Sequence, residues 1–396
     1  MQSRTILGVP GIIIIISILA FLSDLCNSAT SPTVTLLAIK LGATGSFVGT
    51  MVAISSLSRL IIVQPVGILC DRKNPRYFLF LGFFLYIINF LFLIIATSPY
   101  HILIGRIIGG IGSAMFYTAA VTLILKTGGQ KKGLFIGIYA TLMGFGFTIG
   151  PMIGGQIAEK ISYVASYLFS IGAASSALAI TLFVIGKGSR IQISTEASKA
   201  PSSIGYRKLL QNKELLSICL GAFFISEAIG ADTSFFPIFG KGLLLSEGTI
   251  GMILGLRALS STIVRIPAGK LSDLFGSKRL LIGAMVLSAI GLFLVPQFRV
   301  VWLFPVFLSL EGIGYGVFLT TTNTRIGEIS DEGQKGAAVG IYNTFSGIGG
   351  VLNMTILGFV ADAFGVENTF RFTSLMVSTG IIVILVISWL QRRSSK

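Results

Sequence analysis

Eight ionisable side chains interrupt long apolar stretches of the sequence, and they are the residues with the most evident chemistry. Burial in apolar surroundings disfavours the charged form of a carboxylate, whereas a neighbouring arginine favours it. A carboxylate in such a place can therefore bind or release a proton when its surroundings change. The four acids are Asp24, Glu227, Asp232 and Glu311, and the four arginines are Arg59, Arg106, Arg257 and Arg265.

Asp24 is the acid that we expect first to exchange protons, followed by Glu311 and Glu227. Glu227 and Asp232 are five residues apart, about 140° around a helix, so we do not expect both to face one site. The alternative for each residue is a permanent ion pair that only holds helices together, because ionisable groups in apolar surroundings usually pair with one another.

The stretches that hold these charges read as membrane-spanning helices. Hydrophobic residues make up 53% of the 396 residues and charged residues only 11%, whereas soluble domains contain about 25% charged residues. A spanning helix needs about 20 mainly apolar residues, which leaves room for twelve spans. The first is too long for one straight span and should kink near Pro10 and Pro32. The predicted helices are 8–38, 45–69, 76–97, 100–124, 133–157, 163–186, 214–240, 247–269, 279–297, 301–324, 335–360 and 368–390.

Most of the 30 lysines and arginines fall in alternate breaks between these helices. Cytoplasmic loops carry such an excess, so we expect a multi-pass protein of the plasma membrane with both termini in the cytoplasm. The longest polar break divides the chain into an N-terminal bundle at 1–186, a basic cytoplasmic linker at 187–213 and a C-terminal bundle at 214–396. The first apolar run, Ile12–Leu22, ends without a cleavage site and is expected to be a membrane helix rather than a removed signal peptide.

The composition argues against several classes of function. Three isolated cysteines and one histidine leave no ligand set for a metal, and no zinc-protease, nucleophile-elbow or nucleotide-binding motif is present. The net charge of +15 lies in alternate loops rather than on one basic stripe, so nucleic acid is not an expected partner. We expect no enzyme activity, no catalytic residue, no cofactor and no metal. The expected partners are a small-molecule substrate, protons and the lipid bilayer.

Several motifs occur once in each half of the sequence with the same spacing. Six spans between equivalent residues preserve the direction of the chain, which indicates a parallel repeat about an axis along the membrane normal. Two such bundles can rock around a central site. The clearest repeat is Pro65, Gly67, Leu69 and Asp71, which recur as Pro267, Gly269, Leu271 and Asp273.

The loop after the second predicted helix carries the first motif, G-x-L-x-D-R, from Gly67 to Arg72. Glycine lets two helices approach closely, and an aspartate at the membrane face can cap a neighbouring helix. The pattern resembles the signature loop of the major facilitator superfamily, and the resemblance covers nearly the whole chain. It implies the major facilitator fold: an all-α integral membrane protein of twelve transmembrane helices in two pseudo-symmetric six-helix bundles.

This resemblance implies that Asp71 latches the two bundles in the outward-open state, with Gly67 and Arg72 in support. Gly269 and Asp273 are the equivalents in the second copy. That copy has Leu274 where a basic residue is common in the family.

A second motif lies in the fifth predicted helix and reads G-x-x-x-G-P-x-x-G-G. Glycine and proline together are expected to break or kink this helix, and the small residues to form a tightly packed seam. The pattern resembles the antiporter signature of drug–proton exporters, and the second half has Asn353-Met354 in place of its Gly-Pro pair. The motif residues are Gly146, Gly150, Pro151, Gly154 and Gly155.

A third motif surrounds Arg106 in the fourth helix and resembles a family motif whose arginine is associated with proton transfer. In the family, helices one, four, seven and ten line the central cavity. The resemblance therefore places Asp24, Arg106, Glu227, Asp232 and Glu311 on cavity helices, and Arg59, Arg257 and Arg265 on rim helices. Structural pairing of Arg106 alone is the alternative.

The function that these observations favour is secondary active transport, with proton-coupled efflux (antiport) of small amphipathic or cationic compounds by alternating access. The alternative is a proton symporter or facilitator for sugars or organic acids, since the embedded arginines suit an anionic substrate. The resemblance implies a functional monomer.

Overall fold

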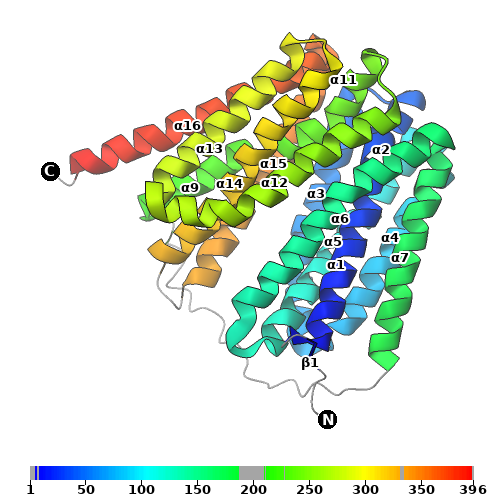
Figure 1. Cartoon of the computed structure of the whole chain (residues 1–396), viewed down its shortest axis with the longest axis horizontal. Helices are drawn as coiled ribbons and strands as arrows, with labels where there is room; N and C mark the ends of the chain where they lie inside the picture. Colours follow the sequence, from blue (N-terminus) through cyan, green and yellow to red (C-terminus); the bar gives the residue numbers. More distant parts are fainter. Residues whose placement is uncertain are drawn as a thin grey trace. The chain divides into compact units, whose positions relative to one another are not determined.

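A computed structural model shows the fold and describes residues 5, 6, 9–186, 209, 211–226, 228–330 and 334–394. Nearly all of this chain is helical (Figure 1). Twelve of its helical segments are long and apolar enough to cross a membrane, which confirms the predicted fold class. Two short strands, β1 (Thr5–Ile6) and β2 (Val9–Pro10), pair antiparallel before the first helix.

The helices agree with the predicted spans and extend several of them at their ends. In the first half they are α1 (Gly11–Ala29), α2 (Ser31–Lys40), α3 (Gly45–Arg72), α4 (Arg76–Ile94), α5 (Pro99–Thr127), η1 (Gly129–Lys131), α6 (Lys132–Lys160) and α7 (Tyr163–Gly186). In the second half they are α9 (Lys213–Ile225), α10 (Ala228–Gly230), η2 (Ala231–Phe235), α11 (Phe236–Gly242), α12 (Glu247–Phe275), α13 (Ser277–Leu294), η3 (Val295–Gln297), η4 (Val301–Leu303), α14 (Phe304–Ile329), α15 (Lys335–Phe364) and α16 (Glu367–Ser394).

Two spans are divided, and one that was expected to break is not. The first span changes from α1 to α2 at Thr30, and Pro32 lies in the first turn of α2, where its missing N–H costs nothing. The first span is therefore divided beside Pro32, where a kink was expected. The seventh span was predicted as one helix, but η2 within it is a π-helical turn. The helix α6 continues through Pro151, so the expected break is not present there, and the expected kink stays a prediction.

The chain forms two compact units that differ from the two halves of the sequence. Unit 1 contains Met1–Ala43, Ile54–Glu196 and Leu245–Gly255, and unit 2 contains Thr44–Ala53, Ala197–Leu244 and Leu256–Lys396. The bundles expected at 1–186 and 214–396 supply most of each unit. However, α3 begins in unit 2 and continues in unit 1, and α12 does the reverse. The expected linker at 187–213 lies almost wholly outside the described residues.

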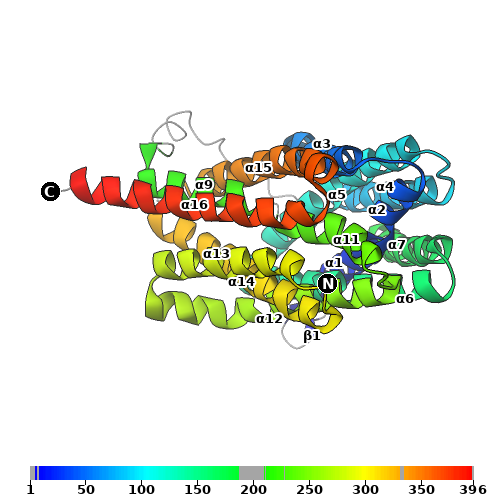
Figure 2. The same ribbon diagram turned by 90° about the horizontal axis from the view of Figure 1, so that it is seen from above.

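Both units use the same pattern of helix packing. In unit 1, α1 packs on α6 and α7, and α4 packs on α5 and α7. In unit 2, α9 packs on α15 and α16, and α13 packs on α14 and α16. Figure 1 shows α1 beside α6, and Figure 2 shows α9 beside α16. This equivalence supports the repeat that the motifs predict.

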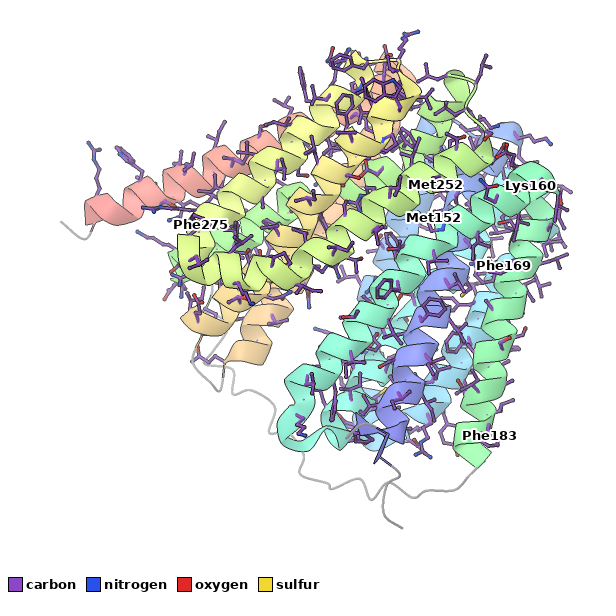
Figure 3. All side chains as sticks on the ribbon, in the orientation of Figure 1. Met152, Lys160, Phe169, Phe183, Met252 and Phe275 are labelled. Carbon is purple, nitrogen blue, oxygen red and sulfur yellow. The ribbon has the colours of Figure 1, made fainter. Side chains whose placement is uncertain are left out.

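Large apolar side chains lie on the outside of the helices, as contact with lipid requires. Phe183 is 61% exposed and Phe275 is 60% exposed. Figure 3 shows them at the ends of α7 and α12. Soluble monomers rarely expose wide apolar patches, whereas lipid tails solvate such side chains.

The glycines of the antiporter-like motif form the seam between α6 and α1. A Cβ added at Gly146, Gly150 or Gly154 would clash with atoms of α1, and at Gly150 it would lie 2.8 Å from the carbonyl oxygen of Leu25. The Ser28 hydroxyl donates to the carbonyl oxygen of Gly146 across the seam at 3.2 Å. Side chains larger than hydrogen are therefore excluded from this face of α6.

The other face of the motif packs on the start of α12, which belongs to the same unit. A Cβ at Gly155 would lie 3.1 Å from the Cα of Gly251, and a Cβ at Gly255 would lie 2.8 Å from the carbonyl oxygen of Thr148. Met152 of α6 and Met252 of α12 mark this region in Figure 3. The motif thus packs α6 between two helices.

Gly154→Ala should destabilise the protein by about 1–3 kcal/mol, because the new methyl group meets the backbone of Ala29. The matched control is Gly137→Ala in the same helix, where a Cβ has open space and alanine favours the helix. The measurement is the midpoint of thermal unfolding in detergent. Equal midpoints for the two variants would show that the seam tolerates a methyl group.

Candidate functional site

Three charged side chains meet in the interior of unit 2. Asp232 comes from η2, Arg257 from α12 and Glu311 from α14. The Nε atom of Arg257 lies 3.0 Å from Asp232 Oδ2 and 2.6 Å from Glu311 Oε2, and its Nη2 atom also lies 2.6 Å from Glu311 Oε2. Arg257 is 1% exposed, and both acids are 0% exposed. One guanidinium is thus shared by two buried carboxylates.

Glycines and the π-helical turn position this acid–arginine cluster. A Cβ at Gly312, the neighbour of Glu311, would clash with the carbonyl oxygen of Arg257, so glycine lets α12 and α14 approach beside the charges. A Cβ at Gly291 of α13 would lie 2.7 Å from the backbone nitrogen of Glu311. The π-turn adds a residue to the helix at Asp232, a local geometry that is common at functional sites.

The charges of the cluster do not balance if both acids are ionised. Among the described residues, Asp232 Oδ1 and Glu311 Oε1 have no hydrogen-bond partner. A buried charge without a partner destabilises a protein by roughly 3–5 kcal/mol. Two carboxylates that share a site seldom ionise together. The geometry therefore suits a site that holds one proton between Asp232 and Glu311.

Asp24 lies in a different site, inside unit 1. It is half-buried on α1, and the Tyr117 hydroxyl of α5 donates to its Oδ1 atom. The guanidinium of Arg59, an exposed side chain of α3, lies over the Tyr117 ring at 5.1 Å from the centroid. A carboxylate beside aromatic rings is a site of the kind that binds organic cations.

Three further residues have predicted roles, Arg106 and Glu227 in the cavity and Arg265 on the rim. Arg106 is half-buried on α5, and its Nε atom has no hydrogen-bond partner among the described residues. Glu227 lies outside the described residues. Arg265 is half-buried on α12, eight residues after Arg257. The structure thus joins Asp232 with Glu311 and leaves Asp24 and Arg106 outside that cluster.

Arg257 was predicted as a rim charge, but it forms the centre of the buried cluster. Sequence position placed it on the eighth span and could not fix the direction of its side chain. Tyr117 was missed altogether. Its signal in the sequence was a polar aromatic residue eleven positions after Arg106 in a mainly apolar helix.

The predicted latch residues lie near the ends of α3 and α12. Asp71 Oδ1 lies 3.4 Å from the Nζ atom of Lys126 in the same unit, and Lys126 also donates to the carbonyl oxygen of Cys70 at 2.9 Å. Arg72 is exposed, and the Gly67 and Gly269 positions have space for a side chain. The side chain of Asp273 lies outside the described part of the chain. The latch role of this loop stays a prediction.

Comparison with known proteins decides the family. The pattern of the Major Facilitator Superfamily matches residues 16–245 and again residues 233–396. The chain belongs to the Major Facilitator Superfamily. An uncharacterised MFS-type transporter of Methanocaldococcus jannaschii is 25% identical over 96% of this chain and 97% of its own. The class E tetracycline resistance protein of Escherichia coli is 22% identical, over 86% of this chain and 84% of its own. The quinolone resistance protein NorA of Staphylococcus aureus is 21% identical, over 87% of this chain and 88% of its own.

Solved structures of other transporters share the fold of this major facilitator protein. The nucleoside transporter NupG matches with a TM-score of 0.79 at 12% identity, over 95% of this chain and 99% of its own. A bacterial homologue of the human lysosomal transporter Spinster matches with a TM-score of 0.74 at 13% identity, over 95% of this chain and 94% of its own. The chain is therefore a multi-pass membrane transporter and not an enzyme.

Arg257→Gln should destabilise this transporter by roughly 3–5 kcal/mol, because it leaves two buried carboxylates without a cation. The triple variant Asp232→Asn, Arg257→Gln, Glu311→Gln removes all three charges and should recover most of the loss. The measurement is thermal unfolding in detergent, followed by size-exclusion chromatography of heated samples. A single variant as stable as the wild type would contradict the shared-guanidinium arrangement.

Proposed function

We propose that this major facilitator protein is a secondary active transporter that exports small amphipathic or cationic compounds in exchange for protons. The observation that carries the proposal is the acid–arginine cluster, in which two fully buried carboxylates share one guanidinium. We place the protein in the plasma membrane with both termini cytoplasmic, on the distribution of basic residues. Transport proceeds by alternating access of the two homologous halves.

The cluster supplies the proton site of this mechanism. With one proton bound, Asp232, Arg257 and Glu311 together are neutral and stable in apolar surroundings. Loss of the proton leaves the cluster with one net negative charge beside Arg257, so movement of α12 relative to η2 or α14 changes the proton affinity. Arg257 lies two residues after Gly255, the last residue of α12 that belongs to unit 1.

We assign the substrate cation to the second site, at Asp24. Its half-buried carboxylate and the ring of Tyr117 suit a positively charged aromatic compound. Asp24 is less suited than Glu311 to hold the coupled proton, since Tyr117 already donates to it and it is less buried. The names of two relatives, which describe resistance to tetracycline and quinolones, agree with export of amphipathic compounds.

The second candidate is a proton symporter or facilitator for sugars or organic acids. It is favoured by Arg106, whose buried Nε atom has no hydrogen-bond partner among the described residues and could bind an anionic group. The direction of proton-driven transport separates the two candidates.

Proteoliposomes with an imposed proton gradient test the proposal. Ethidium, a fluorescent aromatic cation, should move against the proton flow in the wild type. Glu311→Gln and Asp232→Asn should reduce gradient-driven ethidium transport to the level of protein-free liposomes while leaving ethidium binding intact. Asp24→Asn should abolish ethidium binding itself, and with it the exchange.

The control is Glu367→Gln, an acid at the start of α16 that lies in neither site. It should transport ethidium as the wild type does. Ethidium moving in the same direction as protons would favour the symporter. Undiminished gradient-driven transport by Glu311→Gln and Asp232→Asn would remove the cluster from the mechanism.

A further inference from the structure

Two acidic side chains outside the sites described above bind the first turns of α3 and α12. In unit 1, Glu159 at the end of α6 accepts hydrogen bonds from the backbone nitrogen of Gly248 at 3.0 Å and from the hydroxyl of Ser246 at 2.8 Å. In unit 2, Asp362 at the end of α15 accepts from the backbone nitrogens of Gly45 and Ser46 at 2.5 and 2.8 Å. Each carboxylate therefore caps the start of a helix from another part of the sequence.

The two caps are copies of one arrangement. Glu159 and Asp362 occupy equivalent positions of the repeat, and so do the glycines that they bind. Both helices also carry a hydroxyl cap of their own: Thr44 accepts from the backbone nitrogen of Phe47, and Ser246 accepts from that of Thr249, both at 3.2 Å. The same contact thus occurs twice, at equivalent positions of the repeat.

Glycine is required where each carboxylate approaches. A Cβ at Gly45 would lie 2.8 Å from Asp362 Oδ1, and a Cβ at Gly248 would clash with the carboxylate of Glu159. One turn further along, Gly49 packs on the backbone of Met354 and Gly251 on that of Pro151, again in contacts too close for any side chain. The first turns of α3 and α12 are therefore held backbone to backbone.

The capping carboxylates supply what these helix starts lack. The first N–H groups of a helix have no partner within it, and the helix dipole favours a negative charge there. Hydrogen bonds from N–H groups to an ionised acceptor are stronger than neutral ones. Water can replace every one of these bonds when the segments part, so the contact is strong but reversible.

We propose that Glu159 and Asp362 are paired latches, which hold the starts of α12 and α3 in place and release them during the transport cycle. With the termini in the cytoplasm, this end of the helices faces the outside. The latched helices carry the arginines of the two charged sites: Arg257 lies on α12 and Arg59 on α3. Release of a latch therefore acts on a helix that holds a charge of the transport machinery. Only the release of the latches during transport rests on the proposed function, and the two capping contacts do not.

Thiol labelling tests the latches without any substrate. Val48 and Ile250 follow the two caps in α3 and α12, and both are 0% exposed. Each is replaced by cysteine in a protein whose Cys26, Cys70 and Cys219 are changed to alanine. The rate of reaction with a polar maleimide in detergent then reports how often each helix start is released.

Asp362→Asn should raise the labelling of Val48→Cys, and Glu159→Gln that of Ile250→Cys, by about fivefold each. This factor corresponds to roughly 1 kcal/mol, the difference between a charged and a neutral acceptor, at 1.4 kcal/mol per tenfold. Glu367→Gln is the control, because Glu367 lies at the start of α16 and belongs to neither cap, and it should leave both rates unchanged.

Gly45→Ala and Gly248→Ala provide a second, independent pair of variants. They displace the carboxylates by contact and leave their charge in place, so they should raise the same two rates. Labelling that stays at the wild-type rate in all four variants would overturn the latch proposal. If the rates rise but ethidium does not move with a proton gradient, the latches stand and the proposed exchange fails.

Discussion

Arg257 must neutralise two carboxylates where no water can reach, and this requirement shapes the interior of unit 2. A carboxylate in apolar surroundings needs a cation, a hydrogen-bond donor or a proton. The single guanidinium balances one negative charge, and in the proposed mechanism a proton balances the other. Gly291 and Gly312 bring the backbones of α12, α13 and α14 close enough for this sharing. The same imbalance that makes the cluster costly to bury makes it responsive to movement.

Close backbone approach is the second constraint, and it occurs in both units. Helix association in lipid gains little from apolar burial and depends on packing and hydrogen bonds. Glycines therefore line the seams of α6 with α1 and of α15 with α9, where Asn353 also donates to the carbonyl oxygen of Phe223 at 2.9 Å. The first half uses Gly150 at the position of Asn353. Both seams therefore carry a side-chain hydrogen bond, which Asn353 of α15 donates in one and Ser28 of α1 donates in the other.

The sequence predicted the twelve spans and the repeat because both depend on the order of apolar, basic and glycine residues along the chain. The site was harder, because it depends on how each helix is rotated. Arg257 was assigned to a rim from its span number, although its side chain points into unit 2. The π-helical turn that carries Asp232 changes the register of its helix, and no residue in that segment predicts such a turn from the sequence. Glu159 and Asp362 had the appearance of ordinary charges at helix ends.

The exchange of segments between the units has a consequence for how the polypeptide is assembled. Neither half of the sequence contains a complete unit, because Leu245–Gly255 completes unit 1 and Thr44–Ala53 completes unit 2. A fragment made from either half alone would leave glycine-lined backbone facing lipid. Two fragments produced in the same cell would complement each other, much as protomers do in a domain-swapped dimer.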